Sequence, residues 1–382
     1  MKAYNFSEGS INWFKSYLSN RTQIVQVESQ ISDPCDIGDC GAPQGSILGP
    51  LAFLIYNNDF PASSVEGKSI LYADDDTDNS SDKNPDELKD KIQREANRSI
   101  DWVHDNKMIC AGDKTKLLII GTRQMRHSKL TQNGSNVQID VFNNLVEDTK
   151  SEKLLGLIVN NELTWKEQLY GESWRPKGEN SKGLIPQLSK RVGILRKLSK
   201  YLPMSRFKSI SSGLFDSKLI YCLPVFGNVW ISCTNDDKDR KSPGFSKEDN
   251  RKLQVLQNKV CRLKLGQSSY DISTQDLLKE CDQLSVHQLT ALHTLLMVHK
   301  CVTHQKPKTL ANKLTLSHRS NRRKNQIANV NYMLSISRGG FCYRGATLWN
   351  LLPNHLRKPG NDAAFKKGAK SWVVQNIPIK PT

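Results

Sequence analysis

Hydrophobic residues recur at helical spacing over much of this chain. In residues 8–20, Ile11, Phe14 and Leu18 fall on one helical face with Tyr17 beside them. Residues 85–105 are amphipathic in the same way, with polar side chains on the opposite face. The same periodicity predicts helices in five later stretches: 184–202, 206–224, 247–265, 274–281 and 285–303.

Shorter stretches have a different pattern. Three alternating or β-branched runs predict strands: residues 22–27, 116–121 and 153–159. Residues 69–72 and the residues after Asp75 predict a hairpin. Residues 46–58 are apolar on nearly every side, which predicts a buried helix. Together these elements predict an α+β fold with a small antiparallel sheet and many helices.

Composition narrows the possible functions. The 382 residues carry a formal net charge of +17, and a chain this basic is typical of a protein that meets a polyanion. The nine cysteines form no C-x-x-C pair, so they indicate neither a zinc ribbon nor a disulfide framework. The N-terminus lacks a secretory pattern, and the longest apolar runs are too short for a bilayer. We therefore expect an intracellular protein, nuclear or cytoplasmic and not secreted, without a membrane partner.

Two segments about two dozen residues apart hold the candidate chemistry. Residues 41–56 are a glycine-rich turn followed by an apolar run, and residues 70–77 read Ile-Leu-Tyr-Ala-Asp-Asp-Asp-Thr. Asp74 and Asp75 stand together at the expected tight turn. Carboxylates fixed at one point are what metal-assisted phosphoryl transfer requires, and Mg²⁺ prefers such oxygen ligands. The pair therefore predicts a magnesium site in the palm of a template-directed polymerase.

The order of the motifs resembles the reverse transcriptase of non-LTR (LINE-type) retrotransposons of the jockey/CR1-like kind. Residues 41–50 are similar to the G-x-P-Q-G-S-x-L-G-P motif of that family, and residues 72–75 to its [FY]-A-D-D box. Four further elements are also similar: K-T-K at 114–116, L-L-G at 154–156, L-T-W at 163–165 and R-G-A-T-L-W-N-L-L-P at 344–353. The resemblance covers nearly the whole chain.

The resemblance implies an RNA-directed DNA polymerase that adds deoxynucleotides to a primer 3′ end on an RNA template, with Mg²⁺ as cofactor. It makes Asp74 and Asp75 the catalytic metal ligands and places Lys114 at the triphosphate. It assigns the template and nucleotide pocket to Pro43, Gln44, Gly45, Ser46, Tyr72 and Ala73, the primer grip to Leu155 and Gly156, and nucleic-acid contacts to Lys190, Arg191, Arg196, Lys197 and Lys200. It also divides the chain into a partial palm at 1–165, a thumb at 184–232 and a helical C-terminal region at 248–382.

The family places another metal-binding Asp on a strand upstream of the glycine turn, and residues 1–7 resemble the helix that follows that strand. We therefore expect a 5′-truncated copy that does not polymerise alone. One alternative is a non-catalytic module that binds RNA or DNA through its basic thumb. Another is a decayed copy in which an unpaired sheet edge leaves apolar surface exposed. The sequence indicates no protein partner.

Overall fold

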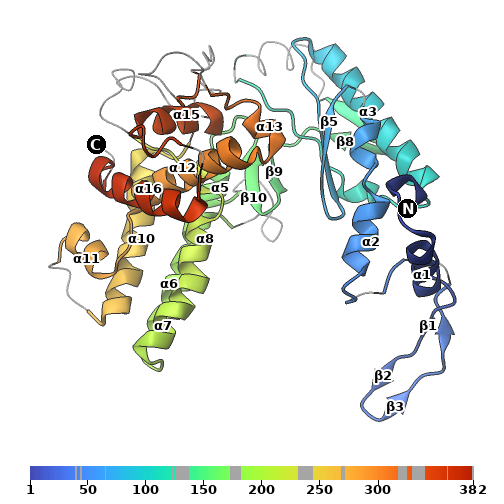
Figure 1. The fold of residues 1–382 in the computed structure, drawn as a ribbon, viewed down its shortest axis with the longest axis horizontal. Coiled ribbons are helices and arrows are strands. Elements are labelled where there is room, and N and C mark those ends of the chain that lie inside the picture. The colour runs from blue at the N-terminus through green and yellow to red at the C-terminus, as the bar shows by residue number, and fades with distance from the viewer. Residues whose placement is uncertain are drawn as a thin grey trace. The chain divides into compact units, whose positions relative to one another are not determined.

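The structure is a computed structural model that describes residues 1–38, 41–43, 45–64, 66–122, 124, 137–172, 182–230, 244–267, 272–316, 325–328, 340–358 and 360–380 (Figure 1). The chain forms two compact units. Unit 1 consists of Met1–Leu117 and His127–Asp148, and unit 2 of Leu118–Arg126 and Thr149–Thr382. The predicted α+β class is confirmed, since helices and small antiparallel sheets both occur.

In its described residues, unit 1 combines short hairpins with the helices α1, α2 and α3. Its elements are η1 (Lys2–Tyr4), α1 (Glu8–Leu18), β1 (Thr22–Gln23), β2 (Gln26–Val27), β3 (Gln30–Ile31), β4 (Cys35–Asp36), α2 (Gly49–Tyr56), η2 (Phe60–Ser63), β5 (Lys68–Tyr72), β6 (Asp75–Asn79), α3 (Pro85–Asp105), η3 (Gly112–Lys114), β7 (Gln138–Val141) and β8 (Asn144–Glu147). The strands pair antiparallel in twos: β1 with β4, β2 with β3, β5 with β6 and β7 with β8. The amphipathic helix and the acidic hairpin are thus confirmed.

Unit 2 is mainly helical. Its elements are β9 (Ser151–Leu154), β10 (Leu157–Asn160), α5 (Lys166–Tyr170), α6 (Leu184–Leu198), α7 (Met204–Ser211), the π-helical η5 (Ser212–Asp216), α8 (Ser217–Ile220), α9 (Leu223–Phe226), α10 (Lys247–Leu265), α11 (Thr274–Glu280), α12 (Val286–His304), α13 (Lys308–Ala311), α15 (Phe341–Leu351) and α16 (Asp362–Asn376). Serines at the predicted starts cap several helices. Ser246 and Ser285 each form a reciprocal capping box with the third residue of α10 and α12.

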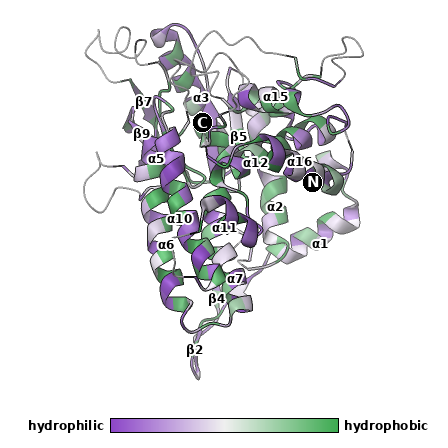
Figure 2. Cartoon of the chain, turned by 90° about the vertical axis from the view of Figure 1, so that its left-hand side faces the viewer, coloured by the Kyte–Doolittle hydropathy of each residue, from purple (hydrophilic) through white to green (hydrophobic). Residues whose placement is uncertain are grey.

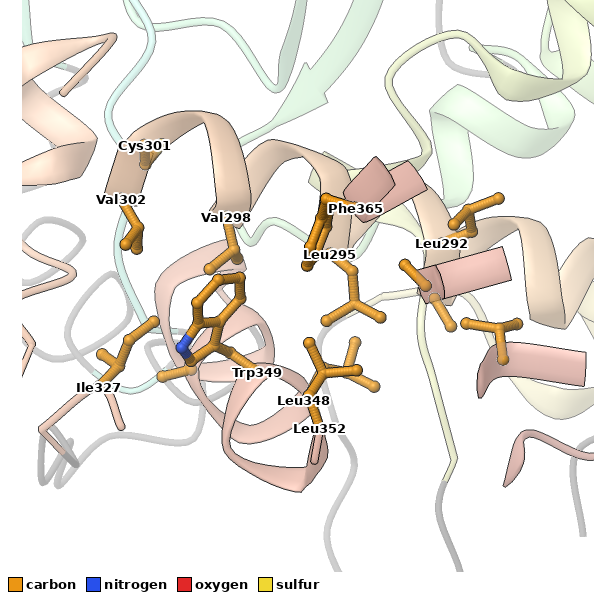
Figure 3. Close-up of a cluster of buried hydrophobic side chains, with 14 of the residues drawn as sticks. Leu292, Leu295, Val298, Cys301, Val302, Ile327, Leu348, Trp349, Leu352 and Phe365 are labelled. Atoms are coloured by element: carbon orange, nitrogen blue, oxygen red, sulfur yellow. The ribbon is translucent and has the colours of Figure 1, made fainter. Parts of the chain in front are cut away.

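Two large cores hold unit 2 together. In one, Trp349 of α15 is fully buried against Val298 of α12 and Phe365 of α16 (Figure 3). In the other, α6 and α10 pack around Leu188, Leu195 and Leu253, which are all fully buried. Burying a large apolar side chain contributes roughly 1.5–3 kcal/mol. These clusters therefore account for most of the stability of this unit.

Four sequence predictions were wrong in detail. The predicted strand at 22–27 is broken, because β1 and β2 pair with different partners. The predicted strand at 116–121 forms only an isolated bridge from Leu117 to Asp148. The stretch at 153–159 is a hairpin and not one strand, since β9 turns into β10 at residues 155–156.

The fourth error concerns α2, whose hydrophobic residues are green in Figure 2. The helix starts at Gly49, with Pro50 in its first turn as predicted, but none of its residues is buried. Leu51, Leu54 and Tyr56 stay exposed because no other described element covers them. An all-round apolar run predicts burial only where a second layer exists to bury it.

The division into units also differs from the implied domains. The β9–β10 hairpin groups with the helices of unit 2, whereas the implied palm extends to residue 165. Compactness does not test functional domain boundaries, so the implied palm, thumb and C-terminal region stay predictions. In the part of the chain that the structure describes, no helix combines the length and the apolar character needed to cross a membrane.

Candidate functional site

The acidic hairpin has a two-residue loop. Tyr72 pairs with Asp75 across β5 and β6, which leaves Ala73 and Asp74 as the loop itself. Ala73 has a φ of 55°, in the left-handed region that residues with a Cβ avoid. The tight loop therefore places Asp74 and Asp75 next to each other at the tip of the hairpin.

Both carboxylates are open to solvent, which is where a metal that also binds substrate phosphates has to sit. Among the described residues, no group of three or more acidic, histidine or cysteine side chains is arranged to hold a metal ion. Mg²⁺ usually takes one or two protein carboxylates and fills its remaining positions with water and phosphate oxygens. Asp74 and Asp75 fit that donor set, but they supply carboxylates for one metal site and not for two.

Asp78, the last acidic residue of β6, has a structural role. Asp78 lies on the face of β6 opposite to Asp75, where Arg98 of α3 donates to both of its oxygens at 3.2 and 3.3 Å. Arg98 also donates to Glu95 at 2.8 Å, and Glu95 is almost fully buried. The second oxygen of Glu95 accepts the backbone N–H groups of Glu66 and Gly67, just before β5. This polar network fastens the hairpin to α3 and leaves Asp78 committed to Arg98.

Asp76 shares that face with Asp78. Burial among neighbouring atoms and the charge of Asp78 raise the pKa of Asp76 to about 7. Since part of the side chain is still exposed, solvent screening reduces the energetic effect of that shift. Asp76 points away from Asp75, so its position does not add it to the pair at the loop.

The glycine turn forms the start of α2. The Ser46 hydroxyl accepts the N–H of Gly49 at 2.9 Å, and Ser46 donates its own N–H to the carbonyl of Pro43. Gly45 has a φ of 82°, which explains why a glycine is needed there. Gln44 lies outside the described residues. Pro43, Gly45 and Ser46 are therefore brought together as a helix-starting turn, and their predicted contact with template or nucleotide stays a prediction.

Lys114 is the last residue of η3 and is exposed. It forms no ion pair within the described part of the chain. Its segment runs near β6, since the charge of Asp76 is among the causes that raise the pKa of Cys110, after burial of the thiol. The structure thus brings the Lys114 segment near the acidic hairpin, and the predicted role at the triphosphate stays a prediction.

A second two-residue loop lies in unit 2. Leu154 pairs with Leu157, so Leu155 and Gly156 form the loop with φ values of 46° and 84°. Positive φ at both positions is the geometry of a type I′ turn, which matches the twist of the hairpin. The Tyr221 hydroxyl donates to the Leu155 carbonyl at 2.5 Å. The predicted primer-grip residues therefore sit on a turn that a tyrosine holds in place, while their contact with a primer stays a prediction.

The five predicted nucleic-acid contacts lie on or just after α6. Lys190 and Lys197 share one face at 100° per residue, and Arg196 lies about 100° further round; all three side chains are exposed. Lys200 follows in the turn after the helix. Arg191 points to another side, where it donates to the Leu214 carbonyl. None of the five pairs with a carboxylate among the described residues, and the nearby ammonium of Lys182 lowers the pKa of Lys190.

Sequence reasoning missed three residues that shape these loops. Arg98 and Glu95 escaped notice because a charged residue on an amphipathic helix looks like a solvated one. Tyr221 escaped because its partner is a backbone carbonyl 66 residues away. The position of Tyr221 three residues after Lys218 was the one sequence signal for its role, and by itself it is weak.

Comparison with known proteins finds a distant relative whose description is consistent with the motifs. The chain is similar to a probable RNA-directed DNA polymerase from transposon X-element of Drosophila melanogaster, with 25% identity over 256 residues that cover 66% of this chain. Those residues cover 24% of the relative, so the chain spans about a quarter of its length. No protein-family profile and no solved structure matches the chain. The similarity supports a distant relationship to the reverse transcriptases of non-LTR retrotransposons.

Proposed function

We propose that this chain carries part of the active site of an RNA-directed DNA polymerase, which extends a DNA primer on an RNA template with deoxynucleoside triphosphates. The observation that supports this most directly is the tight β5–β6 loop, which presents Asp74 and Asp75 together to solvent. The relative's name, an RNA-directed DNA polymerase, adds support for the reaction class.

The residues of the chain divide the work by their chemistry. Asp74 and Asp75 would hold Mg²⁺, which when bound neutralises triphosphate charge and orients the attacking hydroxyl. Lys114, whose ammonium has no carboxylate partner among the described residues, would donate a proton to the departing pyrophosphate or stabilise its charge. The turn at Pro43, Gly45 and Ser46 would border the nucleotide, and the α6 lysines and arginines would contact phosphates of the template–primer duplex.

We further propose that the chain does not polymerise alone. Two-metal transfer clamps both the attacking and the leaving oxygen, and two neighbouring carboxylates on one loop serve one metal site. The two other acidic residues of β6 lie on the opposite face, where Asp76 points away from the loop pair and Asp78 is held by Arg98. A carboxylate from another strand has to complete the site.

Primer extension tests both parts of this proposal. The full chain is assayed alone on an RNA template with Mg²⁺, and again with the upstream strand of an intact relative fused before residue 1. We expect extension only by the fused form, and loss of that extension in Asp74→Asn. Asp101→Asn, which removes an exposed carboxylate from α3, is the matched control and should stay active. Extension by the chain alone would refute the proposed inactivity, and inactivity of every form would refute the catalytic role of the loop.

A non-catalytic nucleic-acid-binding module is the second candidate. It is favoured by the exposed cations of α6, which have no carboxylate partner in the described part of the chain, and by the net charge of +17. Salt-dependent binding of an RNA–DNA duplex by a fused form that never extends the primer would select this candidate.

A further inference from the structure

Two cysteines of unit 2 lie in contact where α11 packs against α10 (Figure 1). Cys261 lies in the second half of α10, and Cys281 is the residue that ends α11. The Cys281 thiol donates to the backbone carbonyl of Cys261 at 3.5 Å, and the two thiols are also in hydrogen-bond contact with each other. Because 20 residues separate the two cysteines along the chain, the fold and not the local sequence brings them together.

The turn after α11 fixes the position of Cys281. Asp282 has a φ of 48°, and the N–H of Gln283 donates to the Leu278 carbonyl at 2.9 Å. This left-handed residue and this hydrogen bond end the helix in a defined way. Leu278 is buried and packs against Cys261 in the same small core. The two thiols are therefore held against each other by a fixed backbone and by apolar packing.

The two thiols differ in their access to solvent. Cys261 is fully buried, whereas Cys281 is partly exposed, and both are free cysteines. An oxidant from solvent can therefore reach Cys281 first. The Cys261 thiol donates to the side-chain oxygen of Gln283 at 3.1 Å, which keeps it at the end of α11 where Cys281 lies. An exposed thiol with a second thiol beside it is the arrangement in which a first oxidation ends as a disulfide.

The electrostatic surroundings of the pair decide how fast it can react. Burial raises the pKa of both thiols, and the positive charge of Lys264 on α10 offsets part of that rise. Lys264 is itself buried and forms an ion pair with Asp216 at 2.8 Å. Since the thiolate is the form that reacts, the pair is oxidised slowly and withstands a brief exposure to oxidant.

We propose that Cys261 and Cys281 form a reversible oxidation site, which hydrogen peroxide converts into a disulfide that locks α11 onto α10. This site does not depend on the proposed polymerase function. It responds to sustained exposure to the oxidant and returns to two thiols when a dithiol reductant is supplied.

The reaction has two steps. The Cys281 sulfur attacks one oxygen of the peroxide, so that an S–O bond forms, the O–O bond breaks and the departing hydroxide takes the thiol proton to become water. The Cys261 sulfur then attacks the sulfur of the resulting sulfenic acid, an S–S bond forms, and the hydroxyl group leaves with the second thiol proton as water. Together the two thiols lose two electrons and two protons, and one peroxide is reduced to two waters. Contact between the thiols favours the second step over further oxidation of Cys281, because another peroxide has to diffuse in.

Peptide mapping of the full chain tests this site. The reduced chain is treated with hydrogen peroxide, its remaining thiols are alkylated, and disulfide-linked peptides are identified by mass spectrometry before and after treatment with dithiothreitol. We expect Cys261 and Cys281 to lose their thiols together, to be linked to each other, and to recover on reduction. Cys342→Ser, which removes a partly buried thiol from α15 of the same unit, is the matched control and should leave the link unchanged.

Thermal unfolding gives the second readout. A disulfide that closes a loop of 20 residues restricts the unfolded chain, so oxidation should raise the unfolding temperature of unit 2 by roughly 5–10 °C. Cys281→Ser keeps a hydroxyl that can donate to the Cys261 carbonyl, and it should unfold at the same temperature with and without peroxide. Cys342→Ser should show the full rise.

The proposal is overturned if both cysteines stay thiols under conditions that oxidise the exposed Cys35. It is also overturned if Cys281 becomes a sulfinic acid while Cys261 stays a thiol, or if Cys281 links to a different cysteine. A linked pair without a rise in unfolding temperature would refute the locking of α11. The mapping uses the original chain, so it decides the matter even where Cys281→Ser does not fold.

Discussion

The two tight hairpin loops of the molecule use the same backbone device on very different supports. Ala73-Asp74 and Leu155-Gly156 are both two-residue loops whose first residue is non-glycine with positive φ. The acidic loop stands on strands whose open face exposes Ile70 and Tyr72, at 56% and 65%. The loop in unit 2 stands on Leu157 and Ile158, which are buried.

This difference shows two ways of holding a strained loop. The β5–β6 hairpin depends on the polar network from Asp78 through Arg98 to Glu95, because few apolar side chains lie beneath it. The β9–β10 hairpin depends on apolar packing and on one hydroxyl, that of Tyr221. Removing one partner of a buried charged network is strongly destabilising. Removing an apolar side chain destabilises in proportion to the volume of the cavity that it leaves.

The largest effect is expected from Glu95→Ala. Removing this buried carboxylate takes one of two carboxylate partners from the half-buried Arg98 and frees two backbone N–H groups, at a cost of about 3–5 kcal/mol in the free energy of unfolding of unit 1. Hydrogen exchange of the β5–β6 amides measures it. Arg94→Ala, which removes another residue of α3 and breaks its exposed ion pair with Glu66, should leave the stability of unit 1 almost unchanged. Equal effects of the two variants would mean that the network does not support the hairpin.

Alanine substitution of one buried and one exposed isoleucine tests how far apolar packing supports each hairpin. Ile158→Ala should destabilise unit 2 by about 2–4 kcal/mol, because Ile158 is 4% exposed and its removal leaves a cavity. Ile70→Ala should change the stability of unit 1 by less than about 1 kcal/mol, because that side chain already faces water. Urea unfolding of both variants measures the two changes in the free energy of unfolding. A large destabilisation by Ile70→Ala would show that another part of the molecule covers this face of the sheet.

Tyr221→Phe isolates the hydroxyl that holds the β9–β10 loop. Loss of one hydrogen bond should cost about 0.5–1.5 kcal/mol and speed exchange of the amides at residues 154–157. Tyr201→Phe is the control, since Tyr201 is 83% exposed and its hydroxyl has no hydrogen-bond partner among the described residues. Unchanged exchange in Tyr221→Phe would remove the tyrosine from the account of the loop.

The smallest effect is expected from replacing the first residue of each loop, which has a positive φ in both hairpins. Ala73→Gly and Leu155→Gly should each relieve left-handed strain and change stability by less than about 1 kcal/mol in the favourable direction. Ala52→Gly, in the helical backbone of α2, should act in the opposite sense by about 1 kcal/mol. Thermal unfolding of the three variants compares them, and destabilisation in all three would mean that the loops are not strained.

Periodicity predicted the elements well where a helix has one apolar face. Helices α3 and α10 were predicted at their observed bounds, because their polar and apolar positions separate. Helix α12 was predicted to within one residue at each end, although it is buried on most sides. It could not predict that α2 stays uncovered, since burial depends on neighbours and not on the run itself. It also could not show that residues 153–159 reverse direction, because Leu155 is an unusual residue for a type I′ turn.

The candidate site also has one part that the sequence predicts and another that only the fold reveals. Adjacent aspartates at a hairpin tip follow from the sequence, because strand, turn and strand are local. The Arg98 network and the Tyr221–Leu155 hydrogen bond join residues far apart in the chain, so only the fold brings them together.

The middle helix of unit 2 depends on the last described residues. His287 of α12 accepts the N–H of Trp230 and donates to the Pro378 carbonyl, while Gln288 donates to the Ile377 carbonyl. These partners are 91 and 89 residues further along the chain. During translation, α12 is therefore synthesised long before the two carbonyl groups that accept hydrogen bonds from His287 and Gln288. Its packing is completed only late in translation, and a ribosome that stalls before residue 377 leaves unit 2 as a client for chaperones.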